Sequence, residues 1–161
     1  MRPKCEICGD KLVEPSGPIN AKILLVGEFP GHEEQISGHP FVGKVGEILR
    51  NESIIAGLDL TMCRITNLWQ HVKNEKGCDI EWHLKMMSKE FKNKKFVLLM
   101  GSDLTKVLFK KGVMELSGLE VPSDLFPKQR IFVSPNPAQL LHGPLGEWRL
   151  SLKRFMEAVN D

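Results

Sequence analysis

Residues 22–27 read Lys-Ile-Leu-Leu-Val-Gly and residues 95–101 read Lys-Phe-Val-Leu-Leu-Met-Gly, and this pattern, present twice, is the strongest indication of the fold. Each stretch is a continuous apolar run that ends in glycine, which is typical of a parallel strand buried on both faces. Two shorter runs are also expected to be strands, Cys-Arg-Ile-Thr-Asn at 63–67 and Arg-Ile-Phe-Val at 130–133. The sequence therefore predicts a four-stranded, mostly parallel sheet.

The segments between these strands carry apolar residues at helical spacing. Residues 43–56, 79–92 and 145–159 carry apolar side chains three or four positions apart, and a further helix is expected after Gly101. Alternating strands and helices predict an α/β fold, a three-layer sandwich with the sheet in the middle. We expect all 161 residues to form one domain, in which residues 1–18 are a turn-rich segment that carries cysteines.

The composition is that of a soluble globular protein, with 42% hydrophobic and 26% charged residues. The formal net charge of +2 neither indicates nor excludes a nucleic-acid partner, because a DNA enzyme needs only a local positive rim. No apolar run reaches the roughly 18 residues of a membrane span, and the N-terminal residues lack the apolar stretch of a secretory signal. We therefore expect a cytoplasmic protein that makes no membrane contact, in which a Cys-x-x-Cys pair indicates metal before a disulfide.

Three of the expected strands end in loops rich in glycine, proline, asparagine and glutamate. These loops follow Val26, Thr66 and Val133. In open α/β sheets, ligands bind outside the carboxyl ends of the strands. We expect the functional site where the three loops converge.

The first of these loops carries a long motif. Residues 27–34 read Gly-Glu-Phe-Pro-Gly-His-Glu-Glu, and residues 38–43 read Gly-His-Pro-Phe-Val-Gly. Together they resemble the leading motif of the family 4 uracil-DNA glycosylases, and Ile-Thr-Asn at 65–67 is similar to that family's second-strand motif. Asn-Pro-Ala at 136–138 lies where the family keeps its final His-Pro motif, and the strand with its glycine at 96–101 lies between the two. Four motifs in this order are far more specific than any one of them.

The resemblance implies a uracil-DNA glycosylase-like fold and a role for each residue of the pocket. Phe41 would stack on a pyrimidine flipped out of the DNA helix, and Asn67 would pair with its O4 and N3–H. Gly27 would take part in binding the base, and Glu34 would stand beside C5, where thymine carries its methyl group. Glu28 would position or activate the attacking water and favour the positive charge that develops on the sugar.

One position departs from the family pattern. Where the family has a His that donates a hydrogen bond to O2 of the leaving uracil, this chain has Asn136. An asparagine amide also donates, but as a neutral group, and losing a good donor of this kind typically costs about 10²–10³ in rate. Related glycosylases that act on mismatched bases carry Asn in this loop. Leu140 and Leu141 follow closely and are expected to wedge into the DNA duplex.

The resemblance also implies a metal site. Cys5 and Cys8 resemble the first two ligands of the iron–sulfur cluster of the family 4 enzymes, His71 falls where the family has its third cysteine, and Cys78 lies near the fourth. This is our preferred ligand set. The Cys-x-x-Cys-Gly knuckle also resembles that of a zinc ribbon, and a Cys₃His set suits tetrahedral zinc. A four-iron four-sulfur cluster and zinc are therefore both retained, beside a site without metal, and the metal would pin residues 1–18 to the domain.

Two further residues are weaker candidates for this site. His83 is a reserve ligand, because it lies in the helix that follows Cys78. Cys63 is a lesser candidate, because a thiol inside a strand is more simply interpreted as part of the core.

The leading functional hypothesis is a DNA repair enzyme that acts as a monomer on DNA containing uracil or a damaged or mismatched base. It would hydrolyse the N-glycosidic bond of the flipped base and leave an abasic site. The alternative is a catalytically weak glycosylase-like module that binds DNA or a protein partner, which Asn136 and the incomplete cysteine set favour. A nucleotide or nucleoside hydrolase that uses the same pocket without base flipping is a third hypothesis.

Overall fold

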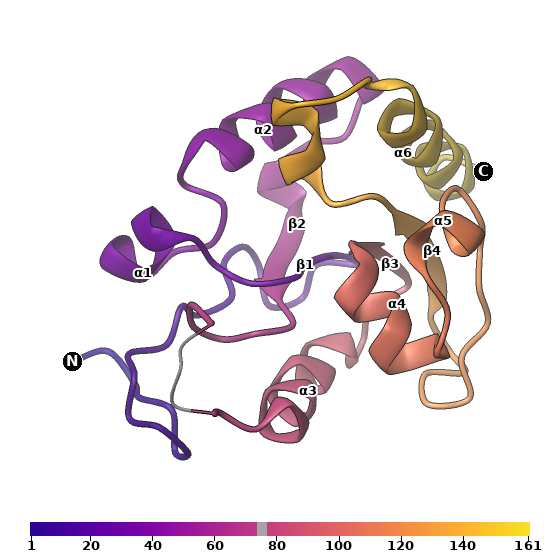
Figure 1. Cartoon of the computed structure of the whole chain (residues 1–161). Helices are drawn as coiled ribbons and strands as arrows, with labels where there is room; N and C mark the ends of the chain where they lie inside the picture. Colours follow the sequence, from indigo (N-terminus) through magenta and orange to yellow (C-terminus); the bar gives the residue numbers. More distant parts are fainter. Residues whose placement is uncertain (74–76) are drawn as a thin grey trace.

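The computed structural model describes residues 1–73 and 77–161 and contains one sheet of four strands. The strands run in the spatial order β2-β1-β3-β4, and each neighbouring pair is parallel (Figure 1). Their bounds are β1 (Ile23–Gly27), β2 (Cys63–Asn67), β3 (Phe96–Met100) and β4 (Arg130–Ser134). The prediction of a four-stranded parallel sheet is confirmed at all four positions.

Helices cover both faces of this sheet, so the predicted three-layer sandwich is confirmed (Figure 1). The pattern did not predict α1 and α5, because each is too short to show a helical period. No helix among the residues placed in the structure is both long and apolar enough to cross a membrane. The helices are α1 (His32–Ser37), α2 (Lys44–Ala56), α3 (Ile80–Ser88), α4 (Ser102–Phe109), α5 (Val113–Leu116) and α6 (Gly146–Val159), with 3₁₀ turns η1 (Leu60–Met62), η2 (Lys89–Phe91) and η3 (Pro137–Leu141).

The strands β1 and β3 are continuous apolar runs because each of their faces meets a different pair of helices. Leu25 and Leu98 point to the layer formed by α2 and α6, where Phe155 is fully buried. Their neighbours Leu24 and Val97 point to the opposite layer, which α3 and α4 provide. Burial on both faces is the physical reason for the continuous apolar runs at 23–26 and 96–100.

Residues 1–18 lie along the β2 edge of the sheet. The backbone groups of Ser16 and Ile65 exchange two hydrogen bonds of 2.9 Å, and the amide of Val13 donates to the carbonyl of Gln70 at 2.6 Å. A covered edge strand cannot pair with another chain there, which removes a common route to aggregation. The same contacts bring the cysteines of this segment close to the residues that follow β2.

Candidate active site and Cys/His cluster

The three polar loops converge on one cavity at the carboxyl ends of β1, β2 and β4, as expected. The cavity has a volume of about 160 Å³. That is well below the roughly 300–1,000 Å³ of pockets that bind drug-sized ligands, so it suits a small ring. Its lining comes from all three loops: Glu28, Phe29, Pro30, Gly31, Glu34, Phe41, Val45, Asn67, Asn136 and Ala138.

Gly27 allows two of the predicted base-binding side chains to approach each other. A Cβ atom at Gly27 would lie 2.5 Å from Oδ1 of Asn67 and 2.5 Å from Cζ of Phe41, closer than side chains tolerate. Any other residue at the end of β1 would therefore displace one of these side chains. Asn67 is buried and Phe41 is half-buried, with its ring against the core layer of α2 and α6.

The backbone of Phe41, which has a positive φ of 53°, packs closely against α2 at Gly46, where there is no side chain. A Cβ atom at Gly46 would overlap the carbonyl oxygen of Phe41. We expect Gly46→Ala to lower the free energy of unfolding by about 1–3 kcal/mol, the usual cost of overpacking. Urea denaturation measures this change.

The matched control for Gly46→Ala is Gly146→Ala at the start of α6, where a new Cβ atom meets nothing within 4 Å. That variant should be as stable as the wild type. Equal stability of both variants would contradict the close fit between α2 and the backbone of Phe41.

Hydrogen bonds to the carboxylate of Glu34 connect the two halves of the long motif. Its Oε1 accepts the amide of Gly31 at 2.9 Å, and its Oε2 accepts the amides of Val42 and Gly43 at 2.9 and 2.7 Å. Charge-assisted hydrogen bonds of this kind are among the stronger ones in proteins. Glu34 thus shapes the loop that carries Phe41 as well as lining the cavity, a role that the sequence did not indicate.

Glu28 is nearly buried, with an exposed fraction of 9%, and its carboxyl fills the space that a side chain at Gly101 would need. Burial raises the pKa of Glu28 above its ordinary value, and the negative charge of Asp103 adds to this rise. Hydrogen bonds from the backbone N–H of Ser102 and from the side chain of Asn136 act in the opposite direction. A carboxylate with a raised pKa is a better proton acceptor, which suits a general base.

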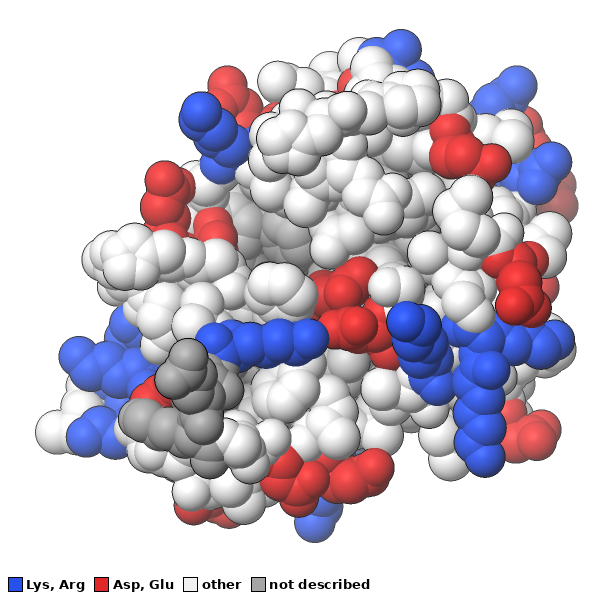
Figure 2. All heavy atoms as spheres, viewed as in Figure 1, with Lys and Arg blue, Asp and Glu red and all other residues white. Residues whose placement is uncertain are grey.

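Asp103 and Lys73 are two site residues that the sequence reasoning missed. Nζ of Lys73 lies 2.8 Å from Oδ2 of Asp103, and it also lies over the ring of Phe29, 5.0 Å from its centroid. Figure 2 shows acidic side chains near the middle of this face, with basic side chains beside them. The signal for Asp103 was its place just after Gly101, at the carboxyl end of β3, where ligands of α/β sheets bind.

Asn136 has a fixed amide orientation. Its Oδ1 accepts the backbone N–H of Ala138 at 2.9 Å and so caps η3. The Nδ2 end therefore donates to Glu28 and faces the cavity. Asn136 thus presents donor hydrogens to the site, as the resemblance requires of this position.

A shallower hollow of about 410 Å³ adjoins the cavity and shares Glu28, Asn136 and Ala138 with it. The rest of its lining comes from η3 and the residues that follow, including His142. Of the two expected wedge residues, Leu141 is 43% exposed, whereas Leu140 is partly buried and packs against the core. The structure therefore leaves Leu141, and not Leu140, accessible for a contact outside the protein.

The candidate metal ligands lie together between residues 5–8, the stretch after β2, and the start of α3. The Sγ atoms of Cys5 and Cys78 are 3.5 Å apart, and Sγ of Cys8 lies 3.3 Å from Nε2 of His71. The reserve ligand His83 has its Nε2 3.2 Å from Sγ of Cys78. The donor atoms of Cys5, His71, Cys78 and His83 all lie within 4.8 Å of one another, so this cluster could hold a metal ion.

Asp10 also belongs to this region and was missed by the sequence reasoning. Its carboxylate lies within 4.8 Å of the donor atoms of Cys8 and His71. The sequence feature that could have identified Asp10 is its position two residues after Cys8.

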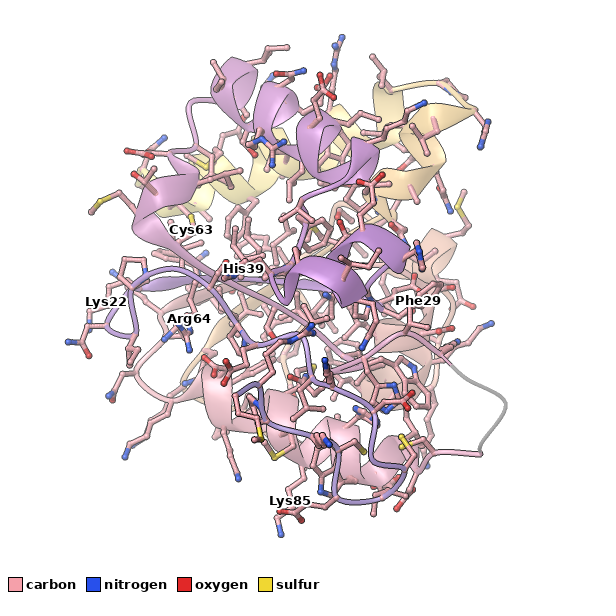
Figure 3. The ribbon with its side chains drawn as sticks, turned by 90° about the vertical axis from the view of Figure 1, so that its left-hand side faces the viewer. Lys22, Phe29, His39, Cys63, Arg64 and Lys85 are labelled. Carbon is pink, nitrogen blue, oxygen red and sulfur yellow. The ribbon has the colours of Figure 1, made fainter. Side chains whose placement is uncertain are left out.

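Cys63 lies apart from this cluster. It is fully buried at the start of β2 among the core residues of the α2 and α6 layer, and burial raises the pKa of its thiol to about 12. Figure 3 places Cys63 and Phe29 on opposite sides of the view, which corresponds to the opposite ends of the sheet. Among the residues that the structure describes, Cys63 is in neither group of potential metal ligands, and it fits the simpler interpretation as a core thiol.

Residues 14–161 match the family model described as the uracil DNA glycosylase superfamily. A type-4 uracil-DNA glycosylase of Thermotoga maritima is 38% identical over 71 residues, which cover 38% of this chain and 36% of the relative. Those of Saccharolobus solfataricus and Archaeoglobus fulgidus are 39% identical over 71 residues and 37% identical over 67 residues. Each of these two matches covers 40% of this chain, and they cover 33% and 34% of the relatives, so the chain spans about a third of the length of the curated relatives it matches.

Proposed function

Because the chain belongs to the uracil DNA glycosylase superfamily, we propose that it hydrolyses the N-glycosidic bond of uracil, or of a related base, in DNA and leaves an abasic site. One observation carries this proposal: a single small cavity is lined by Glu28, Phe41, Asn67 and Asn136, which come from three separate loops. These are the residue types that such a reaction needs at one place.

The cavity would receive the flipped base. Stacking of an aromatic side chain on a base contributes about 1–3 kcal/mol, and Phe41, whose ring lies beside Gly27, would provide this stacking. The amide of Asn67 would donate to O4 and accept from N3–H of uracil. Cytosine presents a donor and an acceptor in the reverse order at these positions, so the same amide orientation would select against it.

The sugar would lie where the cavity meets the shallower hollow, beside Glu28 and Asn136. In the reaction the C1′–N1 bond breaks, and the base leaves with the bonding electrons while positive charge develops on the sugar. A water molecule then adds to C1′, and Glu28 would take its proton. The Nδ2 of Asn136 would donate to O2 of the base as that oxygen gains negative charge.

The surface beside the cavity would contact the DNA. The hollow lined by His142 would face the DNA strand, and the exposed Leu141 would fill the gap left by the flipped base. We propose that the protein acts on DNA as a monomer in the cytoplasm.

The Cys/His cluster would hold a structural metal. It joins residues 5–8 to α3 and to the stretch that contains His71, four residues after Asn67 and two before Lys73. A metal there would fix the loop that carries part of the base pocket. The resemblance implies an iron–sulfur cluster, and the cysteine and histidine ligands also suit zinc.

Asp103→Asn is expected to shift the acidic limb of the pH profile of kcat/KM to lower pH. That limb follows the ionisation of Glu28, because only its carboxylate accepts a proton from water. Asp103 raises the pKa of Glu28 through its negative charge and a hydrogen bond, so its removal lowers that pKa. A larger fraction of Glu28 is then ionised at a given acidic pH. Asp124→Asn, on an exposed loop, is the matched control, and an acidic limb that stays in place would contradict the coupling.

The proposed function is tested with end-labelled oligonucleotides, single-stranded and duplex, that carry one uracil, hydroxymethyluracil or mismatched base. Alkali cleaves any abasic site that forms. Strand cleavage at uracil supports the proposal, and the other bases then define the specificity. Intact strands together with retarded DNA in a gel would instead favour a binding module, and Asn136→His would show whether a stronger donor restores activity. Hydrolysis of free nucleosides without DNA binding would favour a nucleoside hydrolase.

A further inference from the structure

Five cysteine and histidine side chains make up the cluster, but a tetrahedral ion takes four ligands, so one of these five has another role. We infer that Cys5, Cys8, Cys78 and Nε2 of His71 hold a single zinc ion, and that His83 hydrogen-bonds to the sulfur of Cys78 without binding the metal. This inference rests on the proposal above that the cluster holds a metal. It is independent of the glycosylase activity.

The hydrogen bonds of His71 leave its Nε2 available to a metal. Its Nδ1 lies 2.7 Å from the carbonyl oxygen of Val72. Because a carbonyl oxygen only accepts, Nδ1 carries the proton of the neutral ring, and Nε2 keeps its lone pair. Nε2 faces Sγ of Cys8 at 3.3 Å. A metal-binding histidine typically donates its other N–H to a backbone carbonyl in this way.

The hydrogen bonds of His83, in contrast, leave its Nε2 unavailable to a metal. Its Nδ1 accepts the backbone N–H of Gln70 at 2.9 Å. A backbone N–H only donates, so the proton of the neutral ring is on Nε2, which lies 3.2 Å from Sγ of Cys78. Nε2 therefore has no lone pair for a metal, and its N–H points at the sulfur instead.

Two tryptophans fix the ring of His83 in this orientation. The ring centroids of Trp69 and Trp82 lie 4.7 and 4.9 Å from that of His83, which is fully buried. A flip of the ring would also replace Nδ1 by Cδ2–H and leave the amide of Gln70 without an acceptor. The donor role of His83 is thus built into its surroundings.

Three separations between donor atoms of the proposed ligands fit one ion and are too short for an iron–sulfur cluster. With bonds of about 2.3 Å to sulfur and 2.0–2.1 Å to nitrogen, tetrahedral zinc places its ligand atoms about 3.5–3.8 Å apart. Cys5 and Cys78 are 3.5 Å apart at sulfur, Cys8 and His71 are 3.3 Å apart, and the thiol of Cys8 also lies within hydrogen-bond reach of Cys78. Four irons and four sulfides must fit between the ligands of a cluster, which requires wider separations, and such clusters generally have four thiolates.

The test is the metal content of the full chain, purified without oxygen from cells supplied with both zinc and iron. We expect one zinc ion per chain by plasma mass spectrometry and no visible absorption band. Iron at about four per chain with such a band would overturn the assignment of zinc. A chain that binds neither metal would overturn the metal site itself, whatever its activity on DNA.

Two variants test which residues bind the ion. Cys8→Ser should lose its zinc to a chelator, whereas His83→Gln should keep one zinc ion with an affinity about 10–100-fold weaker. Zinc retained by Cys8→Ser and lost from His83→Gln would overturn the ligand assignment. X-ray absorption at the zinc edge of the wild-type protein identifies the ligand atoms without a variant. Three sulfur ligands and one nitrogen ligand are expected, and two of each would contradict the assignment.

Discussion

Asn67→Asp is expected to lower kcat/KM for uracil excision by about 10⁴. A site built to hydrogen-bond its substrate typically rejects a mismatched partner by 10⁴–10⁵, because buried polar groups are left unpaired. Asn67 is buried at the carboxyl end of β2, and its side chain is confined by Gly27 and Phe41, so it cannot turn away. The carboxylate of Asp only accepts, and it would face O4 of uracil without a proton between them.

The same substitution should bring weak excision of cytosine, whose amino group can donate to the new carboxylate. The measurement is the initial rate on matched oligonucleotides that carry one uracil or one cytosine. Asn51→Asp, the same chemical change on the exposed face of α2, is the control and should leave both rates unchanged. Undiminished uracil excision by Asn67→Asp would show that Asn67 does not bind the base.

Glu28→Gln is expected to lower the single-turnover rate by about 10²–10⁴, the usual contribution of a general base. The amide has nearly the shape of the carboxyl group but cannot take a proton from water. Because burial and Asp103 already oppose the ionised form of Glu28, the neutral Gln should not lower the Tm. A loss of rate at unchanged Tm separates a catalytic role from a structural one.

The control for Glu28→Gln is Glu33→Gln, on the exposed side of α1, which should retain the wild-type rate. Binding of the Glu28→Gln variant to uracil-containing DNA should also persist, because Phe41 and Asn67 are unchanged. A variant that still excises uracil at the wild-type rate would remove Glu28 from the mechanism.

The sheet could be predicted from the sequence because strands buried on both faces leave a direct signal, a continuous apolar run that ends in glycine. The convergence of the loops then followed from the parallel topology, since the carboxyl ends of parallel strands meet at one edge. The short helices α1 and α5 could not be predicted, because one or two turns are too short to show the helical period of apolar residues.

The interactions that refine the site could not be predicted, because they join residues far apart in the chain. Lys73 meets Asp103 across 30 residues, and Glu34 reaches the amides of Val42 and Gly43 only after the loop folds back. The sequence proposed Leu140 and Leu141 as equals, but the packing of η3 turns Leu140 toward the core. Side-chain orientation of this kind depends on the tertiary structure alone.

The metal ligands illustrate the same limit. The family resemblance implied the ligands Cys5, Cys8, His71 and Cys78, with His83 in reserve, but it could not distinguish a ligand from a neighbour of a ligand. That distinction depends on which ring nitrogen carries the proton, and the carbonyl of Val72 and the amide of Gln70 determine it. Neither backbone group leaves a signal in the sequence.

The glycosylase activity is tested most directly by mass spectrometry of the products formed from a single-stranded oligonucleotide that contains one uracil. The wild-type protein should release free uracil and an oligonucleotide with one abasic site in equal amounts, and Glu28→Gln should release almost none. An oligonucleotide that remains intact, although the folded protein binds it, would contradict the assignment of a glycosylase.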